Sequence, residues 1–530
     1  MLFTSYAFIG FMFLVFFLYY LVPKRGQWML LLGASYVFYA LCDISYLIYI
    51  IVTTISTYLI SIQLTKIQHK QSDYLKEHKK LMTKEKRKAY KASMKSKQFR
   101  WLIVCLLLNF GILAVLKYTN FAIANVNSII HMTGSDTTIS FVNLVLPLGI
   151  SFYTFQTMGY IIDVYRSTVE AETNPFKLAL FVSFFPQLIQ GPISRFHDLS
   201  NTLFEEHPFD GRQVSFGLQR ILWGYFKKMV IADRILVAVN LIIQSPETYQ
   251  GSYVLIGMVF YGFELYADFT GGIDITIGIA QVMGIRVTEN FARPYFSKNI
   301  AEYWRRWHIT MGTWFKDYIF YPISVCQPML KLSKKTRQRC GDIIGKRIAV
   351  YIATFVAWFA TGIWHGASWN FIMWGIMNCV VILISQECEP LYRRFHNRFP
   401  YGNTSWYRLF QILRTFFLMS SLRLFDCYRD VKTAFLMFFD LFIHFDIRVF
   451  FNGSLMELGL STSDYVVLLI GFLVLLTVSL LQRRGSVREC LHHKPVWIRY
   501  GVIYLLFLSV IIFGAYGMGY DASQFIYNQF

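Results

Sequence analysis

Long apolar segments recur from one end of this 530-residue chain to the other, and they restrict what it can fold into. They cover residues 8–21, 101–116, 253–263, 348–359, 466–481 and 502–514. Several approach the roughly 20 residues that a helix needs to cross the hydrocarbon core of a bilayer. Charged residues make up only 15% of the chain, well below the share of about 25% in soluble domains. We therefore predict an all-α polytopic membrane protein, with a single membrane domain over residues 1–530.

The net charge of +20 is concentrated between the apolar segments. Residues 66–100 hold thirteen Lys or Arg against three acids, an excess that is typical of cytoplasmic loops. This segment is either an amphipathic helix on anionic lipid or a solvated loop that sets the topology. Counting the spans away from it places the N-terminus and the tail 521–530 on the extracytoplasmic side. The same distribution argues against nucleic acid as a partner.

Other segments are harder to assign to simple spans. We expect residues 141–164 to form one span and residues 498–516 to form the last one. Residues 181–195 are apolar but interrupted by two prolines, a glycine and two glutamines, which favours a re-entrant element. Residues 218–239 carry five charged side chains, and we interpret them as an interfacial helix. The eight cysteines show no ligand spacing, so we predict no metal site.

Two polar stretches between residues 290 and 370 contain the candidate functional groups. Read as one helix from about residue 298 to 318, the first has one mainly aromatic face. This face consists of Trp304, Trp307 or His308, Met311, Trp314 or Phe315, and Tyr318. On that helix Arg305 shares a side with His308, while Arg306 points elsewhere. An anchor at the membrane interface explains most of this composition, but it does not explain the histidine in the middle of the face.

The second stretch, residues 361–370, follows an apolar segment and contains His365 between Gly362 and Gly366. An ionisable side chain at membrane depth is costly unless it is paired or used. His365 is either a structural histidine bonded to a nearby carbonyl or an acid/base histidine at the bottom of a cavity. We favour the second interpretation, because imidazole can accept a proton from a hydroxyl group near neutral pH.

Several motifs in this order resemble a known family. They are Asn290-Phe-x-Arg-Pro-Tyr, Trp304-Arg-Arg-Trp-His308, Trp314-Phe-Lys-Asp317-Tyr and Gly362-Ile-Trp364-His365-Gly-Ala-x-Trp369, with further matches in residues 146–156, 163–166, 185–193 and 266–274. Together they resemble the membrane-bound O-acyltransferase family, and within it the bacterial alginate O-acetyltransferase branch. The resemblance is good over about residues 1–380 and looser after that. Residues 420–427 depart from the family pattern.

The resemblance implies a ring of about 11 tilted transmembrane helices, with re-entrant and interfacial helices, around a central tunnel. It implies that His365 is the catalytic histidine and that His308 is the second polar residue near it, within a catalytic core at 290–370. We expect these residues to bind substrate: Arg305, Arg306, Trp304, Trp307, Asp317, Trp364, Asn370 and Gln187. Of these, Arg305 and Arg306 are suited to donor phosphates.

The end of the chain, Phe525-Ile-Tyr527-Asn-Gln-Phe530, resembles the terminal motif of family members that export acyl groups. The resemblance implies that Tyr527 is an acyl relay, whose phenol oxygen carries the acyl group before a partner takes it. An aromatic anchor at the outer interface is the alternative.

The predicted function is a membrane O-acyltransferase of the bacterial cell membrane that serves O-acetylation of an extracellular or cell-wall polysaccharide. It would hold no bound cofactor and would use a thioester donor at the cytoplasmic face, either acetyl-CoA or an acyl carrier protein. The expected partners are membrane lipid and an extracytoplasmic acetyltransferase of the serine-hydrolase (SGNH) type. Two alternatives remain: a carrier-dependent D-alanyl transferase for teichoic acids, and a transporter of lipid-linked glycans in which the histidines relay protons.

Overall fold

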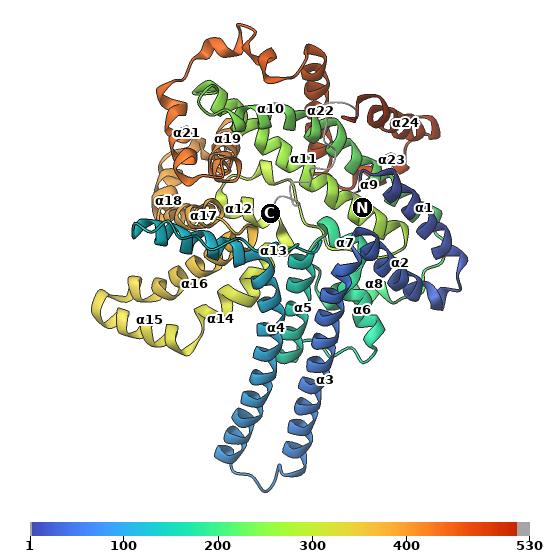
Figure 1. Cartoon of the computed structure of the whole chain (residues 1–530), viewed down its shortest axis with the longest axis vertical. Coiled ribbons are helices and arrows are strands. Elements are labelled where there is room, and N and C mark those ends of the chain that lie inside the picture. Colours follow the sequence, from blue (N-terminus) through green and yellow to red (C-terminus); the bar gives the residue numbers. More distant parts are fainter. Residues whose placement is uncertain (1–2, 517–530) are drawn as a thin grey trace. The chain divides into compact units, whose positions relative to one another are not determined.

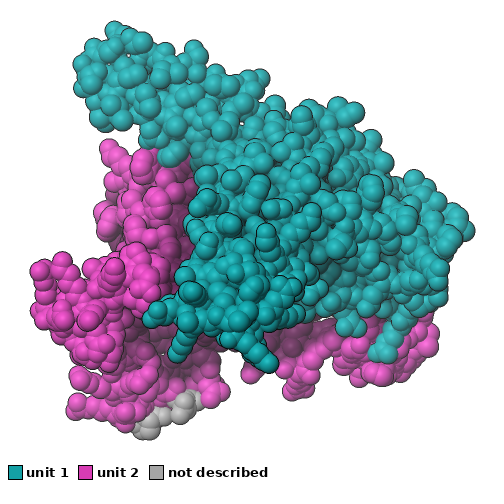
Figure 2. Space-filling view, turned by 90° about the horizontal axis from the view of Figure 1, so that it is seen from below, with its two compact units in different colours: residues 1–214, 280–288 teal, residues 215–279, 289–530 magenta. Residues whose placement is uncertain are grey.

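The computed structural model describes residues 3–516, and the regular structure within that range is all helical (Figure 1). The chain divides into unit 1, residues 1–214 with 280–288, and unit 2, residues 215–279 with 289–530 (Figure 2). The predicted all-α class is thereby confirmed for the described residues. Helices α3, α4, α16, α17, α22 and α24 are long and apolar enough to cross a membrane. The single domain and the count of about eleven spans stay predictions.

The helices of unit 1 are α1 (Tyr6–Leu21), α2 (Gln27–Cys42), α3 (Leu47–Glu77), α4 (Lys84–Met132), α5 (Ile150–Arg166), α6 (Pro175–Ser183), α7 (Phe185–Gln190) and α8 (Phe196–Leu203). Those wholly or mostly in unit 2 are α9 (Gly211–Tyr225), α10 (Asp233–Gln244), α11 (Ser252–Val282), α12 (Ile300–Arg306), α13 (Ile309–Phe315), α14 (Tyr321–Ser324), α15 (Gln327–Cys340), α16 (Asp342–His365), α17 (Trp369–Glu387), α18 (Glu389–Arg398), α19 (Ser405–Leu422), α20 (Leu424–Cys427), α21 (Val431–Ile443), α22 (Thr462–Leu481), α23 (Val487–His492) and α24 (Val496–Phe513). Short 3₁₀ turns cover Lys24–Gly26, Ile44–Tyr46, Pro294–Phe296, Pro400–Asn403, Ile447–Phe450 and Ser454–Leu458, and π-helical segments cover Phe226–Ala232 and Lys316–Phe320.

The basic segment 66–100 is the tip of a helical hairpin in unit 1. Helices α3 and α4 pack along each other (Figure 1) and continue through the basic residues to a short turn between Glu77 and Lys84. Thr83 caps α4, and its side-chain oxygen accepts a hydrogen bond from the backbone N–H of Lys86. Most of the segment is therefore helical rather than a loop, and both its place on anionic lipid and its role in setting the topology stay predictions.

Helix α5 forms the centre of unit 1, and most of its side chains are buried. Residues 135–148, before it, contain no regular helix, and α5 begins at Ile150. The predicted span over residues 141–164 is therefore wrong in its first part. Polar and β-branched residues dominate positions 135–143, and a left-handed Gly149, packed against the carbonyl of Leu188, precedes the first turn of α5.

The interrupted segment 181–195 is a broken helix buried in protein, and its re-entrant character stays a prediction. Helix α6 ends at Ser183, α7 follows from Phe185, and an extended stretch begins at Gly191. Two of its polar groups find partners inside unit 1: Phe185 donates its backbone N–H to Ser35 Oγ, and Gln187 donates to Ser194 Oγ. Such satisfaction by neighbouring protein is what interrupted backbone in an apolar setting requires.

In unit 2, glycines allow α9 and α11 to approach closely. A Cβ atom on Gly224 would lie 2.6 Å from the carbonyl oxygen of Gly271, and one on Gly278 would lie 2.8 Å from that of Gly217. Each helix thus places two glycines seven residues apart, on one face. Small residues at such positions are the usual means of close packing between membrane helices.

The close approach of α9 and α11 corrects our interpretation of residues 218–239. Lys227, Lys228, Asp233 and Arg234 are buried inside unit 2 rather than exposed at an interface. Lys228 Nζ lies 2.7 Å from a carboxylate oxygen of Asp233 and 2.6 Å from one of Asp268 on α11. The charges that suggested an interfacial helix are paired across a helix–helix contact.

Candidate functional site

His308 lies at a break between two short helices. The single helix predicted over residues 298–318 is wrong: α12 ends at Arg306, and α13 starts at Ile309. His308 itself has φ +46°, in the left-handed region, which ends a right-handed helix and is uncommon for residues other than glycine. The break turns the histidine inward, so that its side chain is fully buried.

Asn290 holds this break in place. Its backbone carbonyl accepts the N–H of Ile309, at 2.9 Å. Its side-chain oxygen accepts the backbone N–H and the hydroxyl of Thr310, at 3.0 and 2.9 Å, and lies 3.2 Å from His308 Nδ1. One asparagine therefore satisfies the first donors of α13, which a helix start leaves without partners inside the helix.

These contacts also determine which nitrogen of His308 carries the proton. A backbone N–H can only donate, so the atom of Asn290 that faces Thr310 is the oxygen, and His308 Nδ1 must donate to it. Burial, followed by the positive charge of Arg423, lowers the pKa of His308 to about 3. The imidazole is thus neutral at physiological pH, with the lone pair on Nε2.

His365 is the last residue of α16, and it is 9% exposed. Helix α16 packs closely on α17, because a Cβ atom on Gly375 would lie 2.5 Å from the carbonyl oxygen of Trp358 and 3.0 Å from Cα of Gly362. This glycine contact brings Trp374 of α17 against the histidine, with ring centroids 4.6 Å apart. The C-terminal end of a helix carries partial negative charge, which favours positive charge developing on the imidazole ring.

Trp364 joins the two histidines into one cluster. Its ring centroid lies 5.9 Å from that of His308 and 5.0 Å from that of His365, and it is buried. Phe269 of α11 meets His308 from another side, at 5.0 Å. The structure therefore brings His308, His365 and Trp364 together within unit 2, in a setting of aromatic rings.

The other predicted aromatic residues surround this cluster. Trp307 is buried and stacks on Tyr303, at an interplanar angle of 11°. Trp304 meets Trp358 and Trp374, with ring centroids 4.8 and 5.8 Å away. These rings form the wall between α12 and the hairpin of α16 and α17.

Three of the predicted polar residues have structural partners within their own unit. Asn370 is buried and donates a hydrogen bond of 2.8 Å to the carbonyl of Phe425. Arg306 pairs with Glu302 one turn earlier on α12. Gln187 belongs to unit 1, where Ser194 Oγ accepts its hydrogen bond. Each of these side chains therefore has a structural contact of its own.

The remaining predicted residues are more open or lie elsewhere. Arg305 is exposed on α12. Asp317 follows α13, in the π-helical segment Lys316–Phe320, with Lys316 Nζ at 3.8 Å. Tyr527 lies outside the described residues. Among the described residues, no group of three or more His, Cys, Asp or Glu side chains is arranged to hold a metal ion.

Sequence reasoning missed Arg423. Its guanidinium carbon lies 5.0 Å from the ring centroid of Trp307 and 5.4 Å from that of Trp374, so it bridges rings next to both histidines. A buried ion pair of 2.7 Å with Asp426 holds it there. Both residues lie in the stretch 420–427, whose departure from the family pattern was the one sequence signal that pointed to it.

Comparisons with known proteins agree with the resemblance. The model of the MBOAT, membrane-bound O-acyltransferase family, matches residues 170–428. The chain is 34% identical to the probable alginate O-acetylase AlgI of Pseudomonas syringae pv. tomato, over 71% of this chain and 64% of that one. The probable alginate O-acetylase AlgI of Pseudomonas putida is 34% identical over 71% of this chain and 68% of its own.

A third relative is named for another polymer. The peptidoglycan O-acetyltransferase of Helicobacter pylori is 29% identical to this chain, over 72% of this chain and 67% of its own. The chain spans 64% of the Pseudomonas syringae relative, just under two thirds of its length. With the apolar helices, these matches identify a membrane protein.

Proposed function

The chain belongs to the membrane-bound O-acyltransferase family, and from this we propose that it is a membrane O-acyltransferase. It would move an acetyl group from a cytoplasmic thioester donor across the membrane, for O-acetylation of an extracellular or cell-wall polysaccharide. The observation that carries the proposal is the pair of buried histidines that both contact the ring of Trp364. Two imidazoles in a setting that excludes water suit the acid/base chemistry of acyl transfer.

In this proposal His365 is the general base. The acceptor hydroxyl oxygen attacks the thioester carbonyl, a C–O bond forms, and the C–S bond breaks. His365 takes the hydroxyl proton and returns it to the departing thiolate, so that atoms and charge balance. Partial negative charge at the end of α16 supports the positive ring that exists between these two transfers.

We assign His308 an orienting role. Its Nδ1–H is committed to Asn290, and so the ring offers a lone pair on Nε2 rather than a proton. An oxyanion needs hydrogen-bond donors, so His308 suits the acceptor hydroxyl better than the carbonyl oxygen. Of the two arginines, exposed Arg305 fits donor phosphates better than Arg306, which is paired with Glu302.

The finer architecture and the partners are part of the same proposal. We place the chain in the bacterial cell membrane as a ring of about eleven tilted helices around a tunnel, with both termini extracytoplasmic. No resident cofactor is required; acetyl-CoA or an acyl carrier protein would supply the acyl group. Tyr527 would receive it and pass it to a secreted serine-hydrolase-type acetyltransferase.

Replacement of His365 by Ala tests the proposal. We expect the His365→Ala chain to insert normally but to lose acetyl transfer from labelled acetyl-CoA in membranes and O-acetyl groups on the polysaccharide in cells. His396→Ala is a matched control, because His396 is exposed on α18. Normal acetylation with His365→Ala would refute the proposal.

A second measurement separates an acyltransferase from a glycan transporter. Peptide mass spectrometry of the working enzyme should detect an acetyl ester on Tyr527, and Tyr527→Phe should remove it. Labelled D-alanine, supplied in parallel on its carrier protein, should give no such ester. A transporter would form no acyl intermediate with either donor.

A further inference from the structure

Unit 2 contains a cavity of about 850 Å³ between its helices. One wall consists of aliphatic side chains from α22 and α24, among them Val474, Val478, Leu505 and Leu506. Both helices are candidate membrane spans, and little of their surface is buried in the protein. The cavity therefore lies between the body of unit 2 and two candidate membrane helices.

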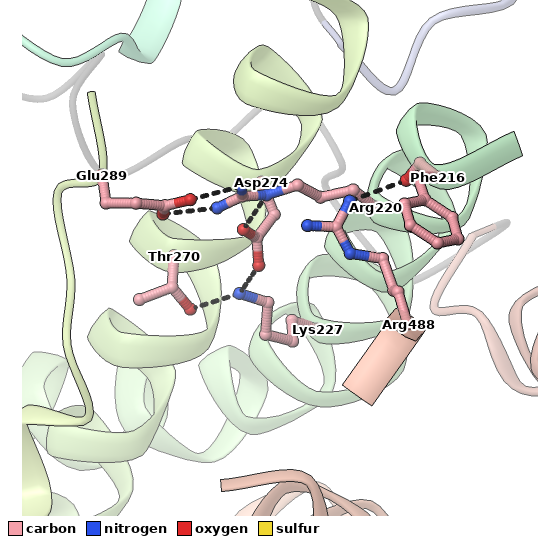
Figure 3. A network of polar contacts seen from close by, with 7 residues as sticks. All are labelled: Phe216, Arg220, Lys227, Thr270, Asp274, Glu289 and Arg488. Atoms are coloured by element: carbon pink, nitrogen blue, oxygen red, sulfur yellow. Dashed lines mark hydrogen bonds and ion pairs between the residues drawn. The ribbon is translucent and has the colours of Figure 1, made fainter. Parts of the chain in front are cut away.

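The lining also includes members of a network of charges (Figure 3). Arg220 Nε lies 2.8 Å from a carboxylate oxygen of Asp274, and its two terminal nitrogens each lie 2.6 Å from Glu289. Lys227 Nζ lies 2.6 Å from the other oxygen of Asp274 and 2.7 Å from Thr270 Oγ1. These two cations and two carboxylates balance one another.

The packing of α9 and α11 explains why these charges meet. Arg220 lies on α9, and Lys227 lies seven residues later in the π-helical segment Phe226–Ala232 that continues it. Each follows one of the interface glycines, Gly217 and Gly224, by three residues. Asp274 follows Gly271 by the same interval on α11. The glycine contacts that bring the backbones together therefore place one carboxylate between two cations.

Two further arginines make the lining of the cavity positive. Arg293 and Arg488 also line it, so four cations face two carboxylates. Burial, and then the positive charges of Arg306 and Arg483, lower the pKa of Arg293. Burial, and then Arg220, lower the pKa of Arg488. Neighbouring positive charge thus contributes to both shifts, and an anion in the cavity would offset it.

We propose that this cavity binds one anionic phospholipid, with its phosphate at Arg293 and Arg488 and its acyl chains along α22 and α24. Basic pockets between membrane helices suit anionic headgroups, because the cytoplasmic leaflet is rich in anionic lipid. A free phosphate or a nucleotide fits the cavity less well than a lipid, because neither would bury the aliphatic side chains that line it. The ligand is therefore an amphiphile with a negative head.

The lipid would also support the candidate site. Phe291 lines the cavity and packs on Trp307, with ring centroids 5.1 Å apart. Trp307 immediately precedes His308 at the break between α12 and α13. A bound lipid would thus contact Phe291, which packs on Trp307, the residue next to His308.

Two variants with matched controls test the proposal. Arg293→Gln/Arg488→Gln removes the proposed phosphate contacts, and Val474→Trp fills the apolar part without changing any charge. Arg484→Gln is the control for the first, because it removes a nearby arginine that does not line the cavity. Leu473→Trp is the control for the second, because Leu473 is on the same helix but exposed and outside the lining.

The experiment uses native mass spectrometry of the delipidated full-length chain in detergent, titrated with phosphatidylglycerol or with phosphatidylcholine of the same acyl chains. Wild type should prefer phosphatidylglycerol. The arginine double variant should bind phosphatidylglycerol more weakly, by about fivefold for each of the two arginines replaced. Val474→Trp should weaken binding of both lipids, whereas both controls should bind like wild type.

Three results would overturn the proposal: equal binding of the two lipids by wild type, equal binding by Val474→Trp and Leu473→Trp, or full displacement of phosphatidylglycerol by inorganic phosphate. The last would indicate a phosphate site rather than a lipid site. If the arginine double variant does not fold, as judged by size-exclusion chromatography, Val474→Trp still decides, because it removes no hydrogen bond or ion pair.

Discussion

The side-chain oxygen of Asn290 lies 3.2 Å from Nδ1 of His308, and this contact fixes the tautomer of the histidine. The same oxygen accepts two hydrogen bonds from Thr310. One buried amide thus orients the ring and starts α13. The position of His308 depends on a residue eighteen positions earlier in the chain rather than on the helix around it.

Asn290→Ala should therefore lower both stability and activity. It removes the oxygen to which the backbone N–H of Thr310 and Nδ1 of His308 donate, at a cost of about 2–4 kcal/mol in the free energy of unfolding. Asn299→Ala is the control: it removes the cap of α12, which costs about 1 kcal/mol. Thermal unfolding in detergent and acetyl transfer in membranes measure the two effects. Equal losses in both variants would contradict the role given to Asn290.

The lowered pKa of His308 predicts a dependence of stability on pH. Because its pKa is about 3 when folded and about 6.5 when unfolded, the unfolded chain binds more protons between these values. The contribution of His308 to the free energy of unfolding is complete above pH 6.5 and is lost as the pH falls toward 3. At pH 5 the loss amounts to about 2 kcal/mol.

His308→Asn isolates this contribution, because asparagine also tolerates the left-handed conformation. Between pH 7 and pH 5, the free energy of unfolding should fall by about 2 kcal/mol more in wild type than in His308→Asn. Denaturation in mixed micelles at both pH values measures this difference. Parallel pH dependence in the two proteins would show that His308 does not titrate as proposed.

Local pattern was enough to predict the helices that are long and apolar, because hydropathy depends only on neighbouring residues. It predicted α22 and α24 within a few residues, and it placed His365 after an apolar segment, where the structure has the end of α16. It failed for the helix over residues 298–318, because the spacing of aromatic residues there also fits two short helices. Only the contact with Asn290 decides between them.

Pairing between distant residues explains the other failures. The charges of residues 218–239 indicated an interface because their partners were not visible in the sequence: Lys228 pairs with Asp268, forty residues later. Arg423 reaches Trp307 from more than a hundred residues away. A charged side chain is by itself predicted to be exposed. It can be buried where the fold places a carboxylate beside it, as Asp268 lies beside Lys228.

The ion pair of Arg423 and Asp426 should make replacements at the two positions interdependent. Arg423→Met leaves the Asp426 carboxylate buried and unpaired, which costs about 3–5 kcal/mol. Adding Asp426→Asn should recover a large part of that loss, because no charge then remains unpaired. A double-mutant cycle on thermal stability measures the coupling energy. Additive losses would mean that the pair contributes nothing as a pair.

The same cycle separates stability from activity. Arg423 also lies over Trp307 and Trp374, and neither contact is restored by Asp426→Asn. The doubly substituted chain should therefore regain stability but not acetyl transfer. Arg423→Lys should keep the charge but lose the planar stacking that arginine provides. Its activity should lie between that of wild type and that of the doubly substituted chain.

Lys228 holds two carboxylates inside unit 2, and its replacement should be among the most damaging in the chain. The side chain is fully buried, with Asp233 at 2.7 Å and Asp268 at 2.6 Å. Lys228→Met leaves two like charges together without their cation, at a cost of about 3–5 kcal/mol. The yield of monodisperse protein should fall sharply, and adding Asp268→Asn should restore part of it. Lys316→Met, which removes a half-exposed ion pair of 3.8 Å, should change the stability by no more than about 1 kcal/mol.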